Sequence, residues 1–442
     1  MDISTVVSYC KENGLIYPSS EICGGFEGFY DYGPLGTLIK NNLQQTLLRW
    51  LVTRRRDIVP LNSSIVCNPM TWKASGHVDR FSDSVLVTKD TKQKTRADHF
   101  VKEQTGLNTE GMSAEQLMSI IKEQNLKYAN EEIINVFDLN TMFRTSVGDK
   151  VDEVVYLRPE TCQSIFTNFR NVISTNRLKL PFGIFQIGKA FRNEIAPRNF
   201  IFRCREFEQA ELEYFYDPVE TPNVDFSFFG NLEILFLSAE KQEKESNELI
   251  PLTIGQLCEL CPAINPYHAY WIFFYYHLLT SVFGLTQRHL RIREHLSREL
   301  SHYSCATVDI EFEYPFGFKE LMGIANRNNY DLIQHETFSK KELSLFKNLA
   351  GERIIPSVIE PSIGLERLFF AIICDSLSNN GKFTTLKIAY CLAPYKVAIF
   401  PLKQNHEEIV KLTEKIHANL IDCDIQSYLD ISGSIGKNFC CG

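Results

Sequence analysis

Hydrophobic and polar residues alternate in many short segments of this chain, and fewer segments show a helical period. "TLIKNNLQQTLLRWLVTRRR" repeats apolar residues every four positions from Ile39 to Leu51, which predicts one stripe of an amphipathic helix. "DIVPLNSSIV" after it predicts a strand, and strand patterns return at "EVVYLRPE", "IFQIGKAF", "FEQAELEYF", "TVDIEFEYPF" and "RIIPSVIEPSIG". Helices are not regularly interposed between them. We therefore predict an α+β fold, with a mostly antiparallel sheet flanked by helices.

The same pattern divides the chain into regions. Residues 89–150 are polar with weak helical periodicity, and we interpret them as an insertion lobe between residues 1–88 and residues 151–385. A helical insertion is predicted at about 221–303. Residues 386–442 start a new unit of strand, helix and short strand.

One apolar segment, "YHAYWIFFYYHLLTSVFGL", is long enough to be compared with a membrane span. Two histidines and several tyrosines interrupt it, and charged segments flank it, so we predict a buried helix and no membrane partner. The first residues do not have the pattern of a signal peptide.

Cysteine content and charge restrict the functional classes. Thirteen cysteines without regular spacing indicate reduced thiols in a cytoplasmic compartment. Cys258 and Cys261 form a C-x-x-C pair, but a structural zinc site normally needs a second pair. The net charge of −8 excludes attraction of nucleic acids by the field of the whole molecule, so such a partner needs a local basic patch.

The segment from Phe191 to Phe215, "FRNEIAPRNFIFRCREFEQAELEYF", carries the first candidate chemistry. Side chains alternate along a strand, so Phe207, Gln209, Glu211 and Glu213 share one face. Buried carboxylates are costly unless paired, so this face must contact water or a cation. Phe207 and Glu211 lie about 13 Å apart along a strand, which suits the two ends of an aminoacyl-adenylate. By itself, the segment is equally consistent with a surface ion-pair hairpin.

Three further segments place charged residues beside strands. "IEPSIGLERLFF" puts Glu360, Ser362 and Gly364 on one strand face before a helix that carries Arg367, an arrangement suited to phosphate. "FGFKELMGIAN" has Glu320 in an otherwise apolar strand, where a carboxylate beside a triphosphate would ligate Mg²⁺. The fourth segment is "YLRPETCQSIF", with Arg158 and Glu160.

Together these segments resemble class II aminoacyl-tRNA synthetases, and among them the homodimeric glycyl-tRNA synthetases. The resemblance extends over colinear blocks that include "GGFEGFYDYGPLG", "NPMTWKASGHVDRFSD", "TRADH", "YLRPET", "HLRIREHLSRELSHYS", "ELMGIANRNNYDLIQH" and "IEPSIGLER". It implies ATP-dependent activation of glycine to glycyl-adenylate, followed by transfer to the 3' end of tRNA(Gly). It also implies Mg²⁺, a cytoplasmic homodimer whose interface includes the helix from Leu38 and a strand with Pro69, and a C-terminal anticodon-binding-type domain.

The resemblance also implies roles for individual residues. Arg192, Arg205 and Arg367 would be catalytic, and Glu320 would bind the metal ion. The residues implied to bind ATP are Arg192, Asn193, Glu194, Phe202, Arg203, Cys204, Arg205, Glu206, Phe207, Glu320, Leu321, Gly364, Leu365, Glu366 and Arg367. Those implied to bind the amino acid are Arg96, Glu160, Phe207, Glu208, Gln209, Ala210, Glu211, Glu360, Pro361, Ser362, Ile363 and Gly364.

Two departures from the family leave alternatives open. Cys162 and Ser164 stand where the family usually has other small residues, which makes Cys162 a candidate for sensitivity to thiol reagents. The C-terminal unit is expected to be incomplete, because "SGSIGKNFCCG" is not followed by the usual further strands and helix. A paralogue that adenylates without charging tRNA, a class II enzyme for another amino acid and a non-catalytic nucleic-acid-binding relative remain alternatives. The last should have lost the arginines that bind ATP.

Overall fold

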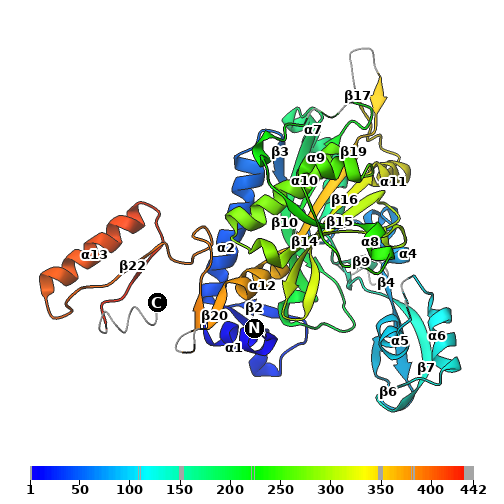
Figure 1. Ribbon diagram of the computed structural model, residues 1–442, viewed down its shortest axis with the longest axis horizontal. Helices are drawn as coiled ribbons and strands as arrows, with labels where there is room; N and C mark the ends of the chain where they lie inside the picture. Colours follow the sequence, from blue (N-terminus) through cyan, green and yellow to red (C-terminus); the bar gives the residue numbers. More distant parts are fainter. Residues whose placement is uncertain are drawn as a thin grey trace.

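A nine-stranded sheet forms the centre of the molecule (Figure 1). The computed structural model describes residues 2–432 except 108, 110, 149–153, 221, 223, 347–351, 380, 382 and 383. The strand order is β13-β12-β14-β15-β16-β19-β11-β10-β3. The strands are β3 (Ile58–Leu61), β10 (Phe182–Phe191), β11 (Glu206–Tyr216), β12 (Ile234–Leu237), β13 (Ile250–Leu252), β14 (Leu290–Glu294), β15 (Ala306–Tyr314), β16 (Gly317–Asn328) and β19 (Ser357–Gly364).

Neighbouring strands of this sheet run antiparallel except for two pairs. Within the described residues, β3 pairs with β10 and β12 pairs with β14 in parallel, while all other neighbours are antiparallel. The predicted α+β fold, with a mostly antiparallel sheet flanked by helices, is confirmed. The flanking helices are α1 (Ile3–Glu12), α2 (Pro34–Leu48), α3 (Pro69–Ala74), α4 (His77–Arg80), α7 (Cys162–Asn176), α8 (Ala239–Glu243), α9 (Ile254–Leu260), α10 (Pro266–His277), α11 (Tyr330–Ser339) and α12 (Leu365–Ser376).

The two faces of strand β11 have different partners. Its even-numbered side chains face the helices α10 and α12, and the ring of Tyr214 lies 5.1 Å from that of Trp271 in α10. Its odd-numbered side chains lie on the opposite face, where Phe215 packs 4.7 Å from Phe169 of α7. Toward the start of the strand, α7 no longer covers this second face, and polar side chains replace apolar ones. The alternation therefore separates a core face from a site face.

Helix α10 forms where the sequence predicts a buried apolar helix. The Asn265 side chain caps it by accepting a hydrogen bond from the His268 amide, and Pro266 occupies its first turn. The helix itself carries apolar residues on all its sides, as expected for an element inside the core. No helix among the described residues is long and apolar enough to span a membrane.

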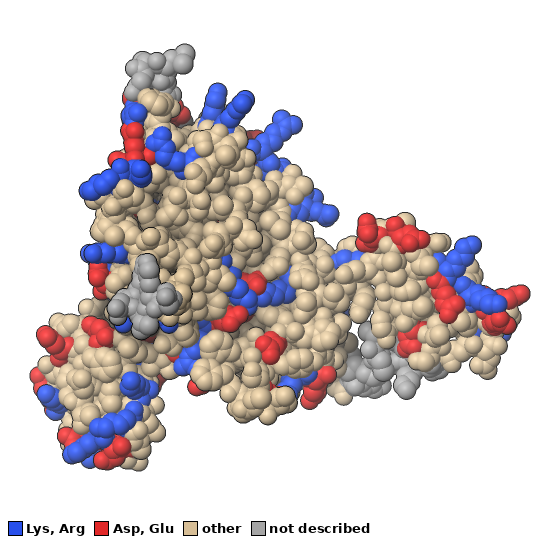
Figure 2. All heavy atoms as spheres, turned by 180° about the vertical axis from the view of Figure 1, so that it is seen from behind, with Lys and Arg blue, Asp and Glu red and all other residues tan. Residues whose placement is uncertain are grey.

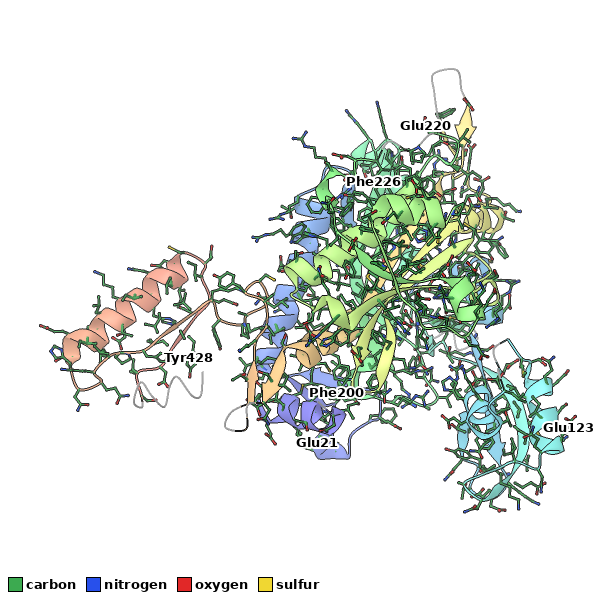
Figure 3. All side chains as sticks on the ribbon, in the orientation of Figure 1. Glu21, Glu123, Phe200, Glu220, Phe226 and Tyr428 are labelled. Atoms are coloured by element: carbon green, nitrogen blue, oxygen red, sulfur yellow. The ribbon has the colours of Figure 1, made fainter. Side chains whose placement is uncertain are left out.

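Two smaller units project from the body on opposite sides in Figure 1. One is a four-stranded sheet of order β5-β4-β7-β6, with Glu123 at the end of its helix α6 (Figure 3). The other pairs β22 with β23 in parallel beside α13, and Tyr428 lies there. The elements are β4 (Ser82–Thr88), β5 (Lys94–Arg96), α5 (Ala97–Thr105), α6 (Ala114–Glu123), β6 (Lys127–Tyr128), β7 (Glu131–Asn140), β22 (Val397–Ile399), α13 (Glu407–Asp422) and β23 (Ser427–Leu429).

The small lobe differs in extent from the predicted insertion. Its sheet already includes β4, before the predicted boundary at residue 89, and its last strand ends at Asn140. The end of the C-terminal unit, residues 433–442, lies outside the described residues. The part of the chain that the structure describes also contains four two-stranded ribbons, built from β1 (Ile16–Pro18), β2 (Tyr30–Tyr32), β8 (Arg144–Ser146), β9 (Val154–Tyr156), β17 (Leu345–Phe346), β18 (Arg353–Ile354), β20 (Leu377–Asn379) and β21 (Thr384–Leu386).

Two sequence predictions are wrong in their secondary structure. The region 221–303 is not only helical, because β12, β13 and β14 add three strands to the central sheet. Their short apolar runs gain a sheet environment only through distant partners such as β15, which local periodicity does not reveal. Pro69 does not lie in a strand either. It begins α3 after an Asn68 cap, a position that suits proline because its missing N–H is not needed there.

Candidate active site

A cavity of about 260 Å³ opens on the site face of β11, between the neighbouring strands and the loop that joins β10 to β11. The loop is fixed by Phe200 (labelled in Figure 3), whose ring lies 5.2 Å from that of Tyr30 and 5.8 Å from that of Phe370 in α12. Sequence-predicted residues that line the cavity are Glu160, Arg192, Glu194, Phe202, Arg203, Cys204, Phe207, Gln209, Glu211, Glu320, Glu360, Ser362, Gly364, Glu366 and Arg367.

Glu211 is the most strongly fixed carboxylate of the cavity. It accepts hydrogen bonds from the Thr161 amide at 2.9 Å, the Ser362 hydroxyl at 2.7 Å and the Gln209 side-chain amide at 3.0 Å. The Thr161 hydroxyl donates to it as well. Burial raises the pKa of Glu211, and the neighbouring charge of Glu160 raises it further. These bonds fix the carboxylate in one orientation at the wall of the cavity, where it can hold a small cationic group.

Two further carboxylates differ in their electrostatics. Burial disfavours the charged form of Glu160, but His77, at 3.3 Å, and Arg327 hold its pKa well below its usual range. Burial raises the pKa of Glu360 to about 8, although Arg327 hydrogen-bonds to it and opposes the shift. Arg327 also binds Asp331 through two hydrogen bonds of 2.7 and 2.8 Å. This end of the cavity therefore gathers the carboxyl groups of Glu160, Glu211 and Glu360 near one fully engaged arginine.

The opposite end of the cavity combines aromatic rings with arginines. The Arg192 guanidinium lies 5.3 Å from the centre of the Phe207 ring and 5.5 Å from that of Phe81. Arg203 forms an ion pair with Glu194 at 2.5 Å. Both arginines belong to the β10–β11 hairpin and face the same space. A planar ring beside forked guanidinium groups is suited to a base and its phosphates.

Arg367 is positioned by the junction of β19 and α12. It lies in the first turn of α12, 4.6 Å from the centre of the Phe202 ring, and pairs with Glu320 at 3.0 Å. The same Nη1 group donates to the Glu320 carbonyl oxygen, and the Nε group donates to that of Phe202. The strand-to-helix junction with an arginine in its first turn thus forms as the sequence indicates.

Sequence comparison places the chain among known proteins. A family model, "tRNA synthetase class II core domain (G, H, P, S and T)", matches residues 143–375. The glycine–tRNA ligase of Malacoplasma penetrans is 37% identical over 450 residues, covering 99% of this chain and 87% of that protein. That of Ureaplasma urealyticum is 38% identical over 446 residues, covering 98% and 85%. The chain belongs to the glycine–tRNA ligase family.

A solved structure supports the fold. A prolyl-tRNA synthetase of Giardia lamblia, in complex with prolyl-adenylate, matches 99% of this chain and 68% of its own with a TM-score of 0.57 and 14% identity. At this identity the likeness concerns the architecture alone. The chain is thus a class II synthetase by fold and a member of the glycine–tRNA ligase family by sequence.

Several residues implied by the family resemblance do not reach the cavity. Arg205 donates to the carbonyl oxygens of Glu194 at 2.9 Å and Glu27 at 2.7 Å, so it supports the hairpin from behind. Glu208 lies on the opposite face of β11 and pairs with Lys40 of α2 at 3.2 Å. For Glu208 the physical reason is strand alternation, since neighbours of a site residue point away from the site. Arg205 precedes β11, and its bonds to loop carbonyl oxygens hold it outside the cavity.

The remaining implied residues have other partners. Arg96 belongs to the lobe, where it pairs with Asp83 at 2.9 Å and Asp98 at 2.5 Å. Glu206 pairs with Lys189 at 2.9 Å. The Asn193 amide donates to the Thr141 carbonyl oxygen. Five further implied residues are buried and do not line the cavity: Ala210, Leu321, Pro361, Ile363 and Leu365.

Asp309 and His295 line the cavity, and sequence reasoning assigned them no role. The two side chains are 2.8 Å apart, and burial raises the pKa of Asp309 to about 6, with Glu320 adding to the effect. The sequence contains a signal for Asp309: the carboxylates of "TVDIEFEY" alternate with other residues, and the same alternation marks the site face of β11.

Cys162 is fully buried, and burial together with Glu160 raises the pKa of its thiol well above the ordinary range. This argues against the expected sensitivity to thiol reagents.

Proposed function

We propose that this chain activates glycine with ATP to form glycyl-adenylate and then transfers the glycyl group to the 3' end of tRNA(Gly). One observation carries the proposal beyond family membership. A single cavity joins a carboxylate end, with Glu211 and Glu160, to an aromatic and arginine end, with Phe207, Arg192 and Arg367. An aminoacyl-adenylate has its ammonium and its base at opposite ends, with one phosphate between them.

The carboxylate end would hold the ammonium group of glycine. Glu211 is oriented by Thr161 and Ser362, so its charge is in place before the substrate arrives. Glycine has no side chain to bind, and selectivity must come from excluding larger amino acids. A rigid pocket rejects an added methyl group by a clash, which discriminates more strongly than the ~1–3 kcal/mol gained by binding one.

The arginine end would hold ATP. The glycine carboxylate attacks the α-phosphorus while pyrophosphate leaves, and this carboxylate is already ionised, so no general base is required. Arg192, Arg203 and Arg367 would neutralise phosphate charge, and Phe207 offers a ring against which a base can stack. The tRNA terminal ribose hydroxyl then attacks the adenylate carbonyl.

A divalent cation such as Mg²⁺ fits the acidic residues of this end. Glu320 and Asp309 come from the adjacent strands β16 and β15 and both line the cavity, and the charge of Glu320 contributes to the raised pKa of Asp309. A pair of carboxylates that repel each other is a suitable donor set for a hard cation. We assign Glu320 and Asp309 to this ion, which would neutralise triphosphate charge when bound.

The other parts of the chain take roles that follow from the family. We propose a cytoplasmic homodimer with α2 near its interface, an insertion lobe that runs from β4 to β7, a catalytic domain from the remaining residues before 386, and an anticodon-binding unit beyond it. Figure 2 shows Lys and Arg side chains projecting from the edge of the body opposite the lobe, so basic charge is local even though the net charge is −8. Such local charge suits contact with a nucleic-acid backbone.

Amino-acid-dependent pyrophosphate exchange with ATP and Mg²⁺, followed by charging of tRNA(Gly), tests this function. Exchange with glycine alone among the twenty amino acids, together with charging, is the expected result. Exchange with another amino acid would overturn the specificity. Glycine exchange without charging would favour a paralogue that adenylates without charging tRNA.

A further inference from the structure

Behind the glycine end of the cavity lies a carboxylate without a partner. Glu213 of β11 is fully buried, and neither of its carboxylate oxygens has a hydrogen-bond partner among the described residues. The register that pairs Glu211 with Ser362 and Tyr214 with Ile359 places Glu213 opposite Glu360. Two ionised carboxylates directly opposed across two strands destabilise a sheet, and a buried carboxylate without a hydrogen-bond partner is costly. The pair can therefore be ionised only beside a further positive charge.

The nearest arginine does not supply that partner. Arg327 directs its donors to Asp331, at 2.7 and 2.8 Å, and to Glu360, and none of its hydrogen bonds reaches Glu213. One guanidinium thus faces three buried carboxylates. The glycine ammonium does not supply the partner either, because Glu213 is absent from the residues that line the cavity.

A thiol completes this cluster from a third element. Cys162, the first residue of α7, is fully buried and donates from its Sγ atom to Glu160 at 2.9 Å. The Cys162 Sγ atom, one oxygen of Glu213 and one oxygen of Glu360 all lie within 4.8 Å of one another. Zinc binds thiolate sulfur at about 2.3 Å and carboxylate oxygen at about 2.0–2.2 Å, so modest side-chain movement would bring the three atoms onto one ion.

We propose that Cys162, Glu213 and Glu360 form a binding site for a thiophilic divalent cation of the Zn²⁺ class. Binding replaces the S–H bond of Cys162, and any O–H bond of Glu213 and Glu360, by bonds to the metal, and the released protons leave to solvent without any change of redox state. The cation neutralises the opposed glutamates. Because Glu360 also lines the cavity, the site lies directly behind the glycine end, and a bound cation competes with the substrate ammonium. This last consequence rests on the proposed function.

Titration of the metal-free full-length chain with Co²⁺ tests the site, because a thiolate bound to Co²⁺ absorbs strongly in the near ultraviolet. We expect saturation at one equivalent, and Zn²⁺ should displace the Co²⁺. Cys258 and Cys261 are the competing source of such a band. The Cys162→Ala variant should lose the band, whereas the matched control, Cys258→Ser with Cys261→Ser, should keep it.

The Glu213→Gln variant provides a second, independent arm. The loss of an outer partner of a metal site already lowers the metal affinity by ~10–100-fold. The loss of a direct ligand in this variant should weaken Co²⁺ binding by at least that factor. It should not lower the melting temperature, since it removes the opposition to Glu360. If Cys162→Ala does not fold, Cys162→Ser keeps a hydroxyl for Glu160 and must still lose the band.

Some outcomes would overturn the site. If the wild-type chain shows no band with Co²⁺, protons neutralise the glutamates. If the band survives in Cys162→Ala, or disappears only in Cys258→Ser with Cys261→Ser, the metal binds elsewhere. Zn²⁺ should also raise the KM for glycine in the wild type but not in Cys162→Ala. A chain that binds Co²⁺ as expected but activates no amino acid would leave the metal site standing and overturn the proposed function.

Discussion

Glu211 gives the sharpest prediction at the scale of a single residue. Its four hydrogen-bond donors hold a charged carboxylate in place, and an amide at this position keeps the size but loses the charge. We expect Glu211→Gln to raise the KM for glycine and lower kcat/KM by about 10–100-fold, the loss of a charge-assisted bond of ~1.5–3 kcal/mol. The KM for ATP should stay nearly unchanged. Glycine-dependent pyrophosphate exchange measures both.

Glu313→Gln is the matched control for this substitution. Glu313 is a glutamate of the same central sheet, but it is exposed on β15 and does not line the cavity. Its glycine KM should equal that of the wild type. An unchanged glycine KM in Glu211→Gln would contradict the assignment of the ammonium site to this end of the cavity.

Arg367 gives the corresponding prediction for ATP. Both Arg367→Ala and Arg367→Lys should lower kcat/KM for ATP by about 10²-fold, because a lysine cannot reproduce the planar fork of donors toward phosphate. The exposed Arg288, changed to Ala, is the control and should leave exchange unaffected. A fully active Arg367→Lys variant would show that only the positive charge matters, and would contradict the proposed role of the planar guanidinium donors. ATP-dependent exchange at saturating glycine is the measurement.

How far individual residues could be predicted depends on how local their signal is. The alternation in "FEQAELEYF" was sufficient to place Phe207, Gln209 and Glu211 on one face, and all three line the cavity. The family resemblance added whole contiguous runs, which include Glu208 on the wrong face and Arg205 behind the hairpin. Asp309 reaches the cavity only because β15 lies two strands from β19 in the sheet, and no single sequence reveals that order.

At the scale of elements, the contact of α10 with the sheet makes stability depend on pH. His268 is fully buried, one ring nitrogen lies 2.9 Å from the Ile324 carbonyl oxygen, and burial lowers its pKa from 6.5 to about 4. Between these two values the unfolded chain binds more protons than the folded one. Stability is therefore complete above pH 6.5 and is lost as the pH falls toward 4. The expected loss is about 3 kcal/mol.

Urea unfolding between pH 7.5 and 4.5 measures this loss. The His268→Gln variant, which retains a donor for the Ile324 carbonyl oxygen, should lack this part of the pH dependence, whatever its stability at pH 7.5. His406→Gln changes an exposed histidine before α13 and should retain the slope of the wild type. Equal slopes for the wild type and His268→Gln would show that the lost stability has another origin.

Elements could be predicted where their pattern is long, and not where it is short. The stripe from Ile39 to Leu51 and the apolar run of α10 each exceed ten residues, and both form helices near the predicted positions. Strands β12 and β13 have only four and three residues. Such short runs fit helix or strand equally, and pairing with distant segments decides between them. For the same reason, the sequence pattern places β14 in a predicted helical region although it forms a strand.

At the scale of the whole molecule, the C-terminal unit is attached to the body by few contacts. Asn42 of α2 donates to the carbonyl oxygens of Leu392 at 3.2 Å and Ala393 at 2.8 Å, and Leu392 is fully buried. The parallel pair β22–β23 and α13 follow this anchor and project away from the sheet (Figure 1). The anchor therefore belongs to the body, whereas the unit beyond it has its own ribbon and helix.

A chain that ends at Lys396 retains this anchor, including the Lys396 side chain that donates to the Ala393 carbonyl oxygen at 2.9 Å. It tests whether the two steps of the reaction use different parts of the molecule. We expect glycine-dependent pyrophosphate exchange to stay within about twofold of the full chain, because a unit with few contacts to the body contributes little to its stability. Charging of tRNA(Gly) should fall by at least about tenfold, because contacts to the nucleic-acid backbone are lost. Equal loss of both activities would mean that the unit is required to fold the catalytic body, which circular dichroism of the shortened chain detects independently. Unchanged charging would show that the body alone recognises the tRNA, and would remove the anticodon-binding role from residues 397–442.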